Sequence, residues 1–198
     1  LFMVGCGLIG GTLLNQILAQ EEFLKKELSL DLKLVGLANS KKMIIRREGI
    51  PLDQWKETLN EIGETSQLST FVEEMEHINL PNSIFIDNTA NEEITHFYEA
   101  ILNASISIST PNKIANSSAY DKYAALKSLS RKRGVMFQYE TNVGAGLPVI
   151  STLNDLINSG DRIIKMEAVL SGSLSYIFNT FGNNGHTFSQ MVEEAMAL

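Results

Sequence analysis

Three glycines near the start of the chain constrain its fold more than any other feature. They follow a short apolar run over residues 1–4 and stand at Gly5, Gly7 and Gly10, in the pattern Gly-x-Gly-x-x-Gly. Apolar residues then recur at helical spacing, at Leu13, Leu14, Ile17 and Leu18. A strand, a glycine-rich turn and a helix in this order are typical of a dinucleotide-binding domain of the Rossmann type.

Each glycine of this pattern has its own physical reason. Gly5 allows a tight turn, Gly7 lets the backbone approach a pyrophosphate, and Gly10 lets the helix pack closely on the strand. The first helical residues, Leu8 and Ile9 among them, have backbone N–H groups that no helical carbonyl accepts, and the helix dipole adds a partial positive charge. We therefore predict that residues 5–10 hold the diphosphate of a dinucleotide. A glycine-rich turn without a ligand is the alternative.

Apolar strands and helical segments alternate along the rest of the chain. Further strands are predicted over residues 32–38, 83–87, 105–109, 135–139 and 163–170. Helices are predicted around Trp55 and Phe71 and over residues 92–103, 119–133, 147–158 and 173–181. This alternation predicts an α/β fold with a doubly wound parallel sheet. The pattern changes near Gly144, which divides the chain into a Rossmann domain, residues 1–145, and the start of a second α+β domain, residues 146–198.

Charge and cysteine content exclude several classes of protein. The chain has 198 residues, and its formal net charge of −7 makes nucleic acid and anionic membranes unfavourable partners. The sequence contains no run of about 18 apolar residues, so no membrane span is predicted. Cys6 is the single cysteine, so an internal disulfide is impossible and a reducing compartment, the cytoplasm, is expected. Because Cys6 lies inside the glycine turn, it is either a small filler side chain, which we favour, or a thiol activated by the helix N-terminus.

Both ends of the sequence indicate a longer polypeptide. Residues 1–4 are only the last piece of a strand, and residues 191–198 stop inside a helical pattern without a terminating signal. We therefore interpret the chain as part of a larger protein.

The end of the second predicted strand bears on the choice between NAD and NADP. An acidic residue at this position bonds the ribose 2′-hydroxyl and repels a 2′-phosphate. The chain has two hydrogen-bonding side chains and two cations there instead, namely Asn39, Ser40, Lys41 and Lys42. We predict NADP as the cofactor, with NAD as a second candidate. The alternative to a phosphate site is a solvated basic turn.

Polar clusters follow three of the predicted strands, over residues 87–90, 110–113 and 140–148. Ligands of an open parallel sheet gather at the carboxyl ends of its strands, so these clusters are expected at the reaction centre. Lys113 belongs to the second cluster. A lysine beside a nicotinamide can donate a proton or stabilise a developing oxyanion during carbonyl reduction. The spacing alone indicates an oxidoreductase and no particular substrate.

At these residues the chain resembles homoserine dehydrogenases, and especially the dehydrogenase part of bifunctional aspartokinase/homoserine dehydrogenases. The matching stretches span nearly the whole chain and cover residues 4–17, 36–43, 110–117, 139–150 and 170–179. The resemblance implies an enzyme of threonine and methionine biosynthesis that interconverts L-homoserine and L-aspartate 4-semialdehyde by hydride transfer with NAD(P). Another NAD(P)-dependent reductase of a small carbonyl, or a non-catalytic dinucleotide-binding module, are the alternatives.

The resemblance also implies roles for individual residues on the cofactor side. Lys113 corresponds to the family's active-site lysine, which lies near both the small-molecule substrate and the nicotinamide. Thr89 and Ala90 correspond to contacts on the nicotinamide side of the cofactor.

Two further sites are implied in the same way. The carboxylate of Glu140 and the backbone carbonyls of Val143, Ala145 and Leu147 correspond to a monovalent cation site, usually assigned to sodium, and such hard oxygen ligands suit the ion. The alternative for Glu140 is a cap on the next helix. Ser171, Gly172 and Ser173 correspond to a turn on the substrate side, and Ser173 is alternatively a helix N-cap.

The chain departs from the family pattern at its end. A Gly-Tyr-x-Glu-Pro-Asp segment and a later Asp and Lys complete the family's homoserine site, and they would follow Leu198. We therefore expect this chain alone to bind NADP without substantial turnover. The family's second domain is the catalytic and dimerisation domain, so the parent protein is expected to be a homo-oligomer.

Overall fold

The computed structural model describes residues 1–181, 185 and 187–197. The chain divides into two compact units, Leu1–Asn142 and Val143–Leu198. The domain boundary predicted near residue 145 lies close to this division.

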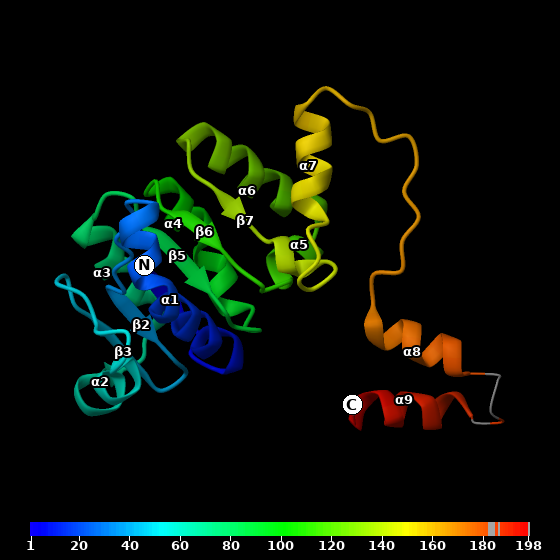
Figure 1. The fold of residues 1–198 in the computed structure, drawn as a ribbon, viewed down its shortest axis with the longest axis horizontal. Coiled ribbons are helices and arrows are strands. Elements are labelled where there is room, and N and C mark those ends of the chain that lie inside the picture. Colours follow the sequence, from blue (N-terminus) through cyan, green and yellow to red (C-terminus); the bar gives the residue numbers. More distant parts are fainter. Residues whose placement is uncertain (182–184, 186, 198) are drawn as a thin grey trace. The chain divides into compact units, whose positions relative to one another are not determined.

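The first unit is built on a seven-stranded sheet with the order β4-β3-β2-β1-β5-β6-β7 (Figure 1). Its strands are β1 (Phe2–Val4), β2 (Gly36–Ala38), β3 (Lys42–Ile45), β4 (Glu64–Thr65), β5 (Ile84–Asp87), β6 (Ser107–Ser109) and β7 (Phe137–Gln138). Five neighbouring strands, β2, β1, β5, β6 and β7 in sheet order, pair in parallel, so β1 lies between β2 and β5. The chain reverses its winding direction at β1, which places a ligand crevice at the carboxyl ends of β1 and β5. The predicted Rossmann-type sheet is confirmed.

Helices connect these strands in the first unit. They are α1 (Leu8–Glu27), α2 (Trp55–Ile62), α3 (Leu68–Ile78), η1 (Glu93–Phe97), α4 (Tyr98–Asn103), α5 (Ile114–Ser117), α6 (Tyr120–Arg133) and η2 (Glu140–Asn142). The single helix predicted over residues 92–103 is two elements, because η1 is a 3-10 helix and α4 is an α-helix. Asn91 and Thr95 explain the irregular start, since their side chains hydrogen-bond Glu93 N and Glu92 O and compete with regular helical pairing.

The edge of the sheet beyond β2 differs from the predicted all-parallel arrangement. Strands β3 and β4 pair antiparallel to their neighbours. The cause is a tight turn, in which the Asn39 side-chain oxygen accepts from the N–H groups of Lys41 and Lys42 at 2.8 Å each. A connection this short can return the chain only as a hairpin, because a parallel strand needs a long crossover.

The core of the first unit lies on both faces of β1. All three residues of β1 are buried, as expected for a central parallel strand. On one face Met3 belongs to a cluster with Leu14 and Trp55, and the 6% exposure of Trp55 makes it a packing residue. On the other face Phe2 meets Phe71 edge to face, with ring centroids 6.4 Å apart.

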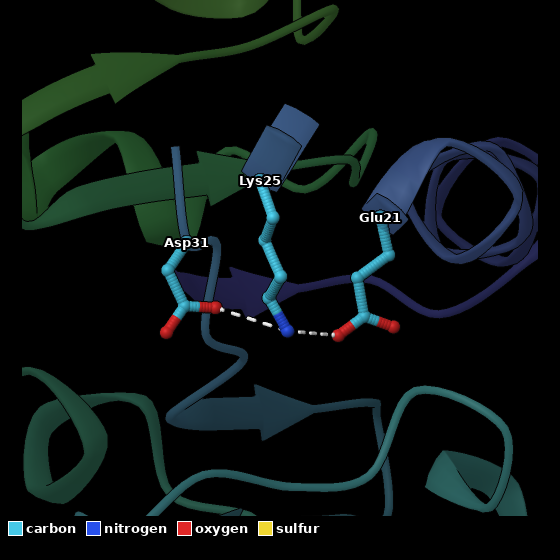
Figure 2. A network of polar contacts seen from close by, with 3 residues as sticks. All are labelled: Glu21, Lys25 and Asp31. Atoms are coloured by element: carbon cyan, nitrogen blue, oxygen red, sulfur yellow. Dashed lines mark hydrogen bonds and ion pairs between the residues drawn. The ribbon is translucent and has the colours of Figure 1, made fainter. Parts of the chain in front are cut away.

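A small polar network fixes the C-terminal end of α1 to the loop before β2. The Lys25 ammonium lies 2.6 Å from Glu21 Oε1 and 3.3 Å from Asp31 Oδ1 (Figure 2). The hydrogen bond to Glu21, and then the one to Asp31, raises the pKa of Lys25 above its ordinary value. Because all three side chains are largely exposed, the network orients the loop more than it stabilises the fold.

The described part of the second unit contains three helices, α7 (Ile150–Asn158), α8 (Gly172–Thr180) and α9 (Phe188–Ala197). Helices α8 and α9 lie side by side (Figure 1), with the Phe181 ring edge-on to Phe188 at 5.7 Å. The strand predicted over residues 163–170 is wrong, since the segment has no regular structure and Ile164 is 97% exposed. A strand requires a partner for its backbone groups, and the described residues of this unit contain no other strand.

Gly10→Ala tests the close packing of α1 on β1. A Cβ at Gly10 would lie 2.0 Å from the Gly5 carbonyl oxygen, a backbone atom that cannot move aside cheaply. We expect the substitution to lower the free energy of unfolding by roughly 3 kcal/mol in urea denaturation. Gly7→Ala is the matched control, because nothing lies within 4 Å of its Cβ position, and it should cost less than about 1 kcal/mol. Equal losses for the two variants would contradict this description of the turn.

Candidate functional site

The three glycines of the turn differ in what holds them in place. Gly5 has a φ of +90°, and a Cβ there would lie 2.9 Å from the Asn88 carbonyl carbon. Gly10 is blocked by the Gly5 carbonyl oxygen in the same way. The protein's own packing therefore requires two glycines. It does not require Gly7, where a Cβ would meet nothing within 4 Å, so this backbone is open to an external group.

The start of α1 presents unpaired backbone donors at this opening. Gly7 is the N-cap residue, no side chain caps the helix, and the first turn has no acidic residue. The N–H of Gly11 donates to the Gly7 carbonyl at 2.8 Å, so the N–H groups before it have no helical acceptor. Leu8 is 88% exposed, which leaves the backbone around it accessible. These features suit the binding of an anionic group.

A cleft lies on one side of the turn and is called the Ser40 cleft below. Its volume is about 620 Å³, and its lining includes Gly5, Asn39, Ser40, Ser66, Gln67, Ser69 and Thr89. Asn39 and Ser40, two of the predicted cofactor residues, line this cleft. Lys41 and Lys42 do not line it, and the Lys42 ammonium donates to the Asn60 carbonyl in α2 instead.

A second cleft lies beside the N-terminal turns of α1 and is called the Thr110 cleft below. Its volume is about 410 Å³. One wall includes Leu8 and Ile9 of α1, and the other is formed by the carboxyl ends of β5, β6 and β7, with Asn88, Thr110 and Glu140. The neighbours Asn88 and Thr89 thus line different clefts. Two compartments on either side of a helix N-terminus suit a molecule with two ends and a charged centre.

The polar clusters after β5 and β6 meet in one buried network. Asp87 is fully buried, and its Oδ2 accepts from the Tyr98 hydroxyl at 2.6 Å and from Asn112 Nδ2 at 2.9 Å. The other oxygen, Oδ1, accepts from the Thr89 N–H at 2.8 Å. Thr110 joins the strands a second time, because its hydroxyl donates to the Asp87 carbonyl at 2.8 Å. Burial, followed by the charge of Asp87, raises the pKa of Tyr98, which therefore stays a hydrogen-bond donor.

Lys113 directly follows this network in the chain. Its backbone is the N-cap of α5, and its carbonyl accepts from the N–H of Ser117 at 2.9 Å. The side chain of Lys113 is exposed. Ala90, also exposed, follows Thr89 on the neighbouring loop. The exposed ammonium of Lys113 therefore follows directly on the buried hydrogen-bond network of Asp87.

Several buried polar atoms near the strand ends have no protein partner. They are Asn88 Nδ2, Asn116 Nδ2 and Oδ1, and Asn142 Oδ1. Buried amide atoms without partners are rare in proteins, and a bound ligand or water is a usual explanation. Asn88 also lines the Thr110 cleft, so its amide is a donor available to a bound molecule there.

The residues expected to hold a cation belong to different units. Glu140 is half-buried at the start of η2 and lines the Thr110 cleft. Val143, Ala145 and Leu147 belong to the second unit, where Ala145 has a φ of +51°. Among the described residues no group of three or more His, Cys, Asp or Glu could hold a metal ion. The site of one carboxylate and three backbone carbonyls is of another kind and stays a prediction.

The turn expected on the substrate side is the start of α8. Ser171 is the N-cap, and its hydroxyl oxygen accepts from the Leu174 N–H at 3.2 Å. The alternative that Ser173 is the N-cap is therefore wrong. Ser173 and Gly172 lie in the first turn and are exposed.

Sequence reasoning missed two parts of this site. Tyr98 lies 11 residues from Asp87 on an apolar helix, and nothing in that pattern marks a polar role. The Ser40 cleft is completed by Ser66 and Ser69 around the start of α3. A run of small polar residues before a helix was the available signal for this wall.

Length and polarity of the helices bear on membrane association. Of the helices in the described residues, none has the apolar length that a bilayer crossing requires.

Two family models match the chain. The model described as "Homoserine dehydrogenase, NAD binding domain" matches residues 5–140, and the model described as "Homoserine dehydrogenase" matches residues 148–198. The chain is 45% identical over 195 residues to the chloroplastic bifunctional aspartokinase/homoserine dehydrogenase 2 of Arabidopsis thaliana. This match covers 98% of this chain and 21% of the relative. It is 38% identical over 199 residues to the homoserine dehydrogenase of Schizosaccharomyces pombe, covering 98% of this chain and 53% of the relative.

Solved structures share the fold. A Candida auris protein of unknown function has a TM-score of 0.80 at 31% identity, over 100% of this chain and 55% of that one. A hyperthermophilic archaeal homoserine dehydrogenase in complex with NADPH has a TM-score of 0.79 at 24% identity, over 98% of this chain and 59% of that one.

Cys6 reactivity tests the packing of the glycine turn. Burial raises the pKa of the Cys6 thiol to about 12, and its sulfur donates to the Ala38 carbonyl at 3.2 Å, as expected of a filler side chain. Only the thiolate reacts with iodoacetamide, so we expect alkylation at pH 7.5 to be at least about 100-fold slower than for glutathione. Unfolding in urea should restore the ordinary rate. A folded-state rate close to that of glutathione would contradict the buried, neutral thiol.

Proposed function

Because the chain belongs to the homoserine dehydrogenase family, we propose that it forms the NADP-binding and lysine-bearing part of an enzyme that interconverts L-homoserine and L-aspartate 4-semialdehyde. The observation that carries this proposal is the open backbone at Gly7, which exposes the uncapped start of α1 between two clefts. The chain spans 21% of the length of the Arabidopsis relative, so the activity proposed is that of the complete protein.

The residues of the turn fit a dinucleotide diphosphate. The backbone N–H groups of Leu8, Ile9 and Gly10 would hold it, since they lack helical acceptors and lie at the positive end of the helix dipole. Gly7 leaves the space that a phosphate needs, and an alanine methyl would fill it. When bound, the reduced nicotinamide supplies the hydride for the carbonyl.

The Ser40 cleft suits the adenosine end of NADP. Ser40 and Asn39 line it and offer polar groups to a ribose 2′-phosphate. The turn after β2 has no acidic side chain to repel that group, and the carboxylate in the cleft lining, Glu93, comes from η1 instead. Lys41 is exposed on the same turn and contributes positive charge at longer range. Lys42 has its ammonium on the Asn60 carbonyl, so we assign it no direct contact. NAD remains a second candidate cofactor.

The other end of the cofactor is assigned to the Thr110 cleft, which Asn88 lines. Thr89 and Ala90, on the same loop, are proposed as contacts on the nicotinamide side, with Thr89 at the border to the Ser40 cleft that it lines. Lys113 lies on the adjoining loop, and its ammonium would donate a proton to the carbonyl oxygen as the hydride arrives. In the reverse direction the neutral amine would accept a proton from the homoserine hydroxyl. Glu140 is proposed as the carboxylate ligand of a sodium ion, with the carbonyls of Val143, Ala145 and Leu147.

The remaining assignments concern the second unit and the whole protein. Ser171, Gly172 and Ser173 are proposed to contact the amino acid substrate, and the second domain is proposed to form a homo-oligomer. The Arabidopsis relative is a chloroplastic protein, so the cytoplasmic location expected from the single cysteine stays a prediction.

Turnover by the complete protein tests the reaction and the role of Lys113 together. We expect NADPH oxidation with aspartate semialdehyde, and a fall in kcat of about a hundredfold to ten-thousandfold in Lys113→Ala. Lys132→Ala removes an exposed lysine from α6 and should leave kcat unchanged. Activity on other aldehydes alone would reject the substrate. Full turnover in Lys113→Ala would remove this lysine from the chemistry, and inactivity on every carbonyl would favour a non-catalytic binding module.

Ser40→Glu tests which cleft receives the 2′-phosphate. A carboxylate in the Ser40 cleft would repel that group, so the Kd for NADPH should rise roughly tenfold or more while the Kd for NADH changes little. Ser128→Glu adds the same charge on an exposed face of α6 and is the control. Isothermal titration calorimetry measures the Kd of both cofactors for the wild-type protein and for each variant. Equal weakening of NADPH and NADH by Ser40→Glu would count against this assignment.

A further inference from the structure

We propose that Asp87 is a positioning residue that fixes Lys113 relative to the cofactor by holding two loops with one carboxylate. The inference rests on the proposed function, in which Lys113 transfers a proton beside the nicotinamide. Asp87 itself is fully buried and lines neither cleft, so it acts through the residues that it holds.

The two oxygens of Asp87 serve different loops. Oδ1 accepts from the backbone N–H of Thr89 at 2.8 Å, on the loop assigned to the cofactor. Oδ2 accepts from Asn112 Nδ2 at 2.9 Å, on the loop that carries Lys113. A carboxylate is planar and rigid, so bonds to both oxygens fix the separation of the two loops.

Burial makes this arrangement hard to distort. Asp87 is 0% exposed and Asn112 is 2% exposed, so neither group can exchange its partner for bulk water. Hydrogen bonds to a charged acceptor are stronger than neutral ones, and a buried charge that loses a donor carries a large penalty. A buried carboxylate is a poor choice for stability alone, because apolar packing of the same volume often does better. Its geometry is therefore the property that the fold uses.

Asn112 passes this constraint to Lys113 through the backbone. The Asn112 side-chain oxygen accepts from the Ile114 N–H at 3.0 Å, so one amide group holds both Asp87 and the start of α5. Lys113 lies between these two anchored residues. The backbone oxygen of Asn112 also accepts from Asn142 Nδ2 at 3.2 Å.

Asn112→Ser separates the bonds that Asn112 Nδ2 donates, to Asp87 and to the Asn91 carbonyl at 2.9 Å each, from the bond that its oxygen accepts. A serine hydroxyl can still accept from the N–H two residues on, in the manner of the Asn112 oxygen. It is too short to reach the Asp87 carboxylate. Ser83→Ala is the control, because it removes a part-buried side-chain hydrogen bond, to the Leu80 carbonyl at 2.8 Å, at the opposite end of the β5 segment.

The first readout needs no catalytic activity. Lys113 is labelled with an amine-reactive acetylating reagent, with and without NADPH, and its labelling is quantified by peptide mass spectrometry. We expect NADPH to protect Lys113 from acetylation in the wild-type protein and in Ser83→Ala. In Asn112→Ser the protection should fall at least about fivefold although the Kd for NADPH stays within about twofold. Full protection in Asn112→Ser would overturn the proposal.

The second readout is a double-mutant cycle on kcat in the complete protein. Asn112→Ser should lower kcat about tenfold to a hundredfold, the size expected for a misplaced catalytic group, and should have no further effect in the Lys113→Ala background. Equal effects of Asn112→Ser with and without Lys113 would overturn the proposal while leaving the dehydrogenase activity in place. Absence of any dehydrogenase activity would instead reject the proposed function, and the labelling result would still decide on the positioning. If Asn112→Ser does not fold, Asp87→Asn enters both experiments with the same expected results.

Discussion

The close approach of α1 to β1 is the constraint on which the rest of the first unit depends. Gly5 and Gly10 come so near that any side chain at the second position would enter the carbonyl of the first. This contact fixes the N-terminus of α1 at the carboxyl edge of the parallel strands. The helix thereby separates two clefts and presents its unpaired N–H groups between them. A cofactor with two ends and a charged middle fits this division.

The second organising element is a buried charge that pairs with neutral donors. Asp87, at the end of β5, connects to the loops after β5 and β6 and to a helix through Thr89, Asn112 and Tyr98. The sheet brings these loops to one edge, and the carboxylate fixes their spacing. In the function that we propose, the glycine turn provides the place for the cofactor, and the network determines where the neighbouring lysine lies relative to it. Rigidity of this kind is what a proton and hydride transfer between fixed partners requires.

The sequence was informative wherever function or packing imposes a local pattern. Gly5, Gly7 and Gly10 predicted the turn, and the apolar runs predicted the central strands β1 and β5. Partners that are distant in the chain left no such pattern, as for Asp87 and Asn112, which are 25 residues apart. The antiparallel edge depends on one side chain, Asn39, that closes a hairpin. The prediction of a strand over residues 163–170 was wrong because a strand also depends on a neighbouring strand for its hydrogen bonds. The sequence pattern predicted Lys42 at a phosphate, but its ammonium donates a hydrogen bond to the Asn60 carbonyl in α2.

Whether the start of α1 holds the diphosphate of NADP is decided by an NMR titration of the isotope-labelled protein with NADPH. We expect the amide resonances of Leu8, Ile9 and Gly10 to shift more than any others, and Gly7→Ala to weaken or abolish these shifts without unfolding the protein. Saturable binding that leaves these three amides unchanged would contradict this location of the diphosphate.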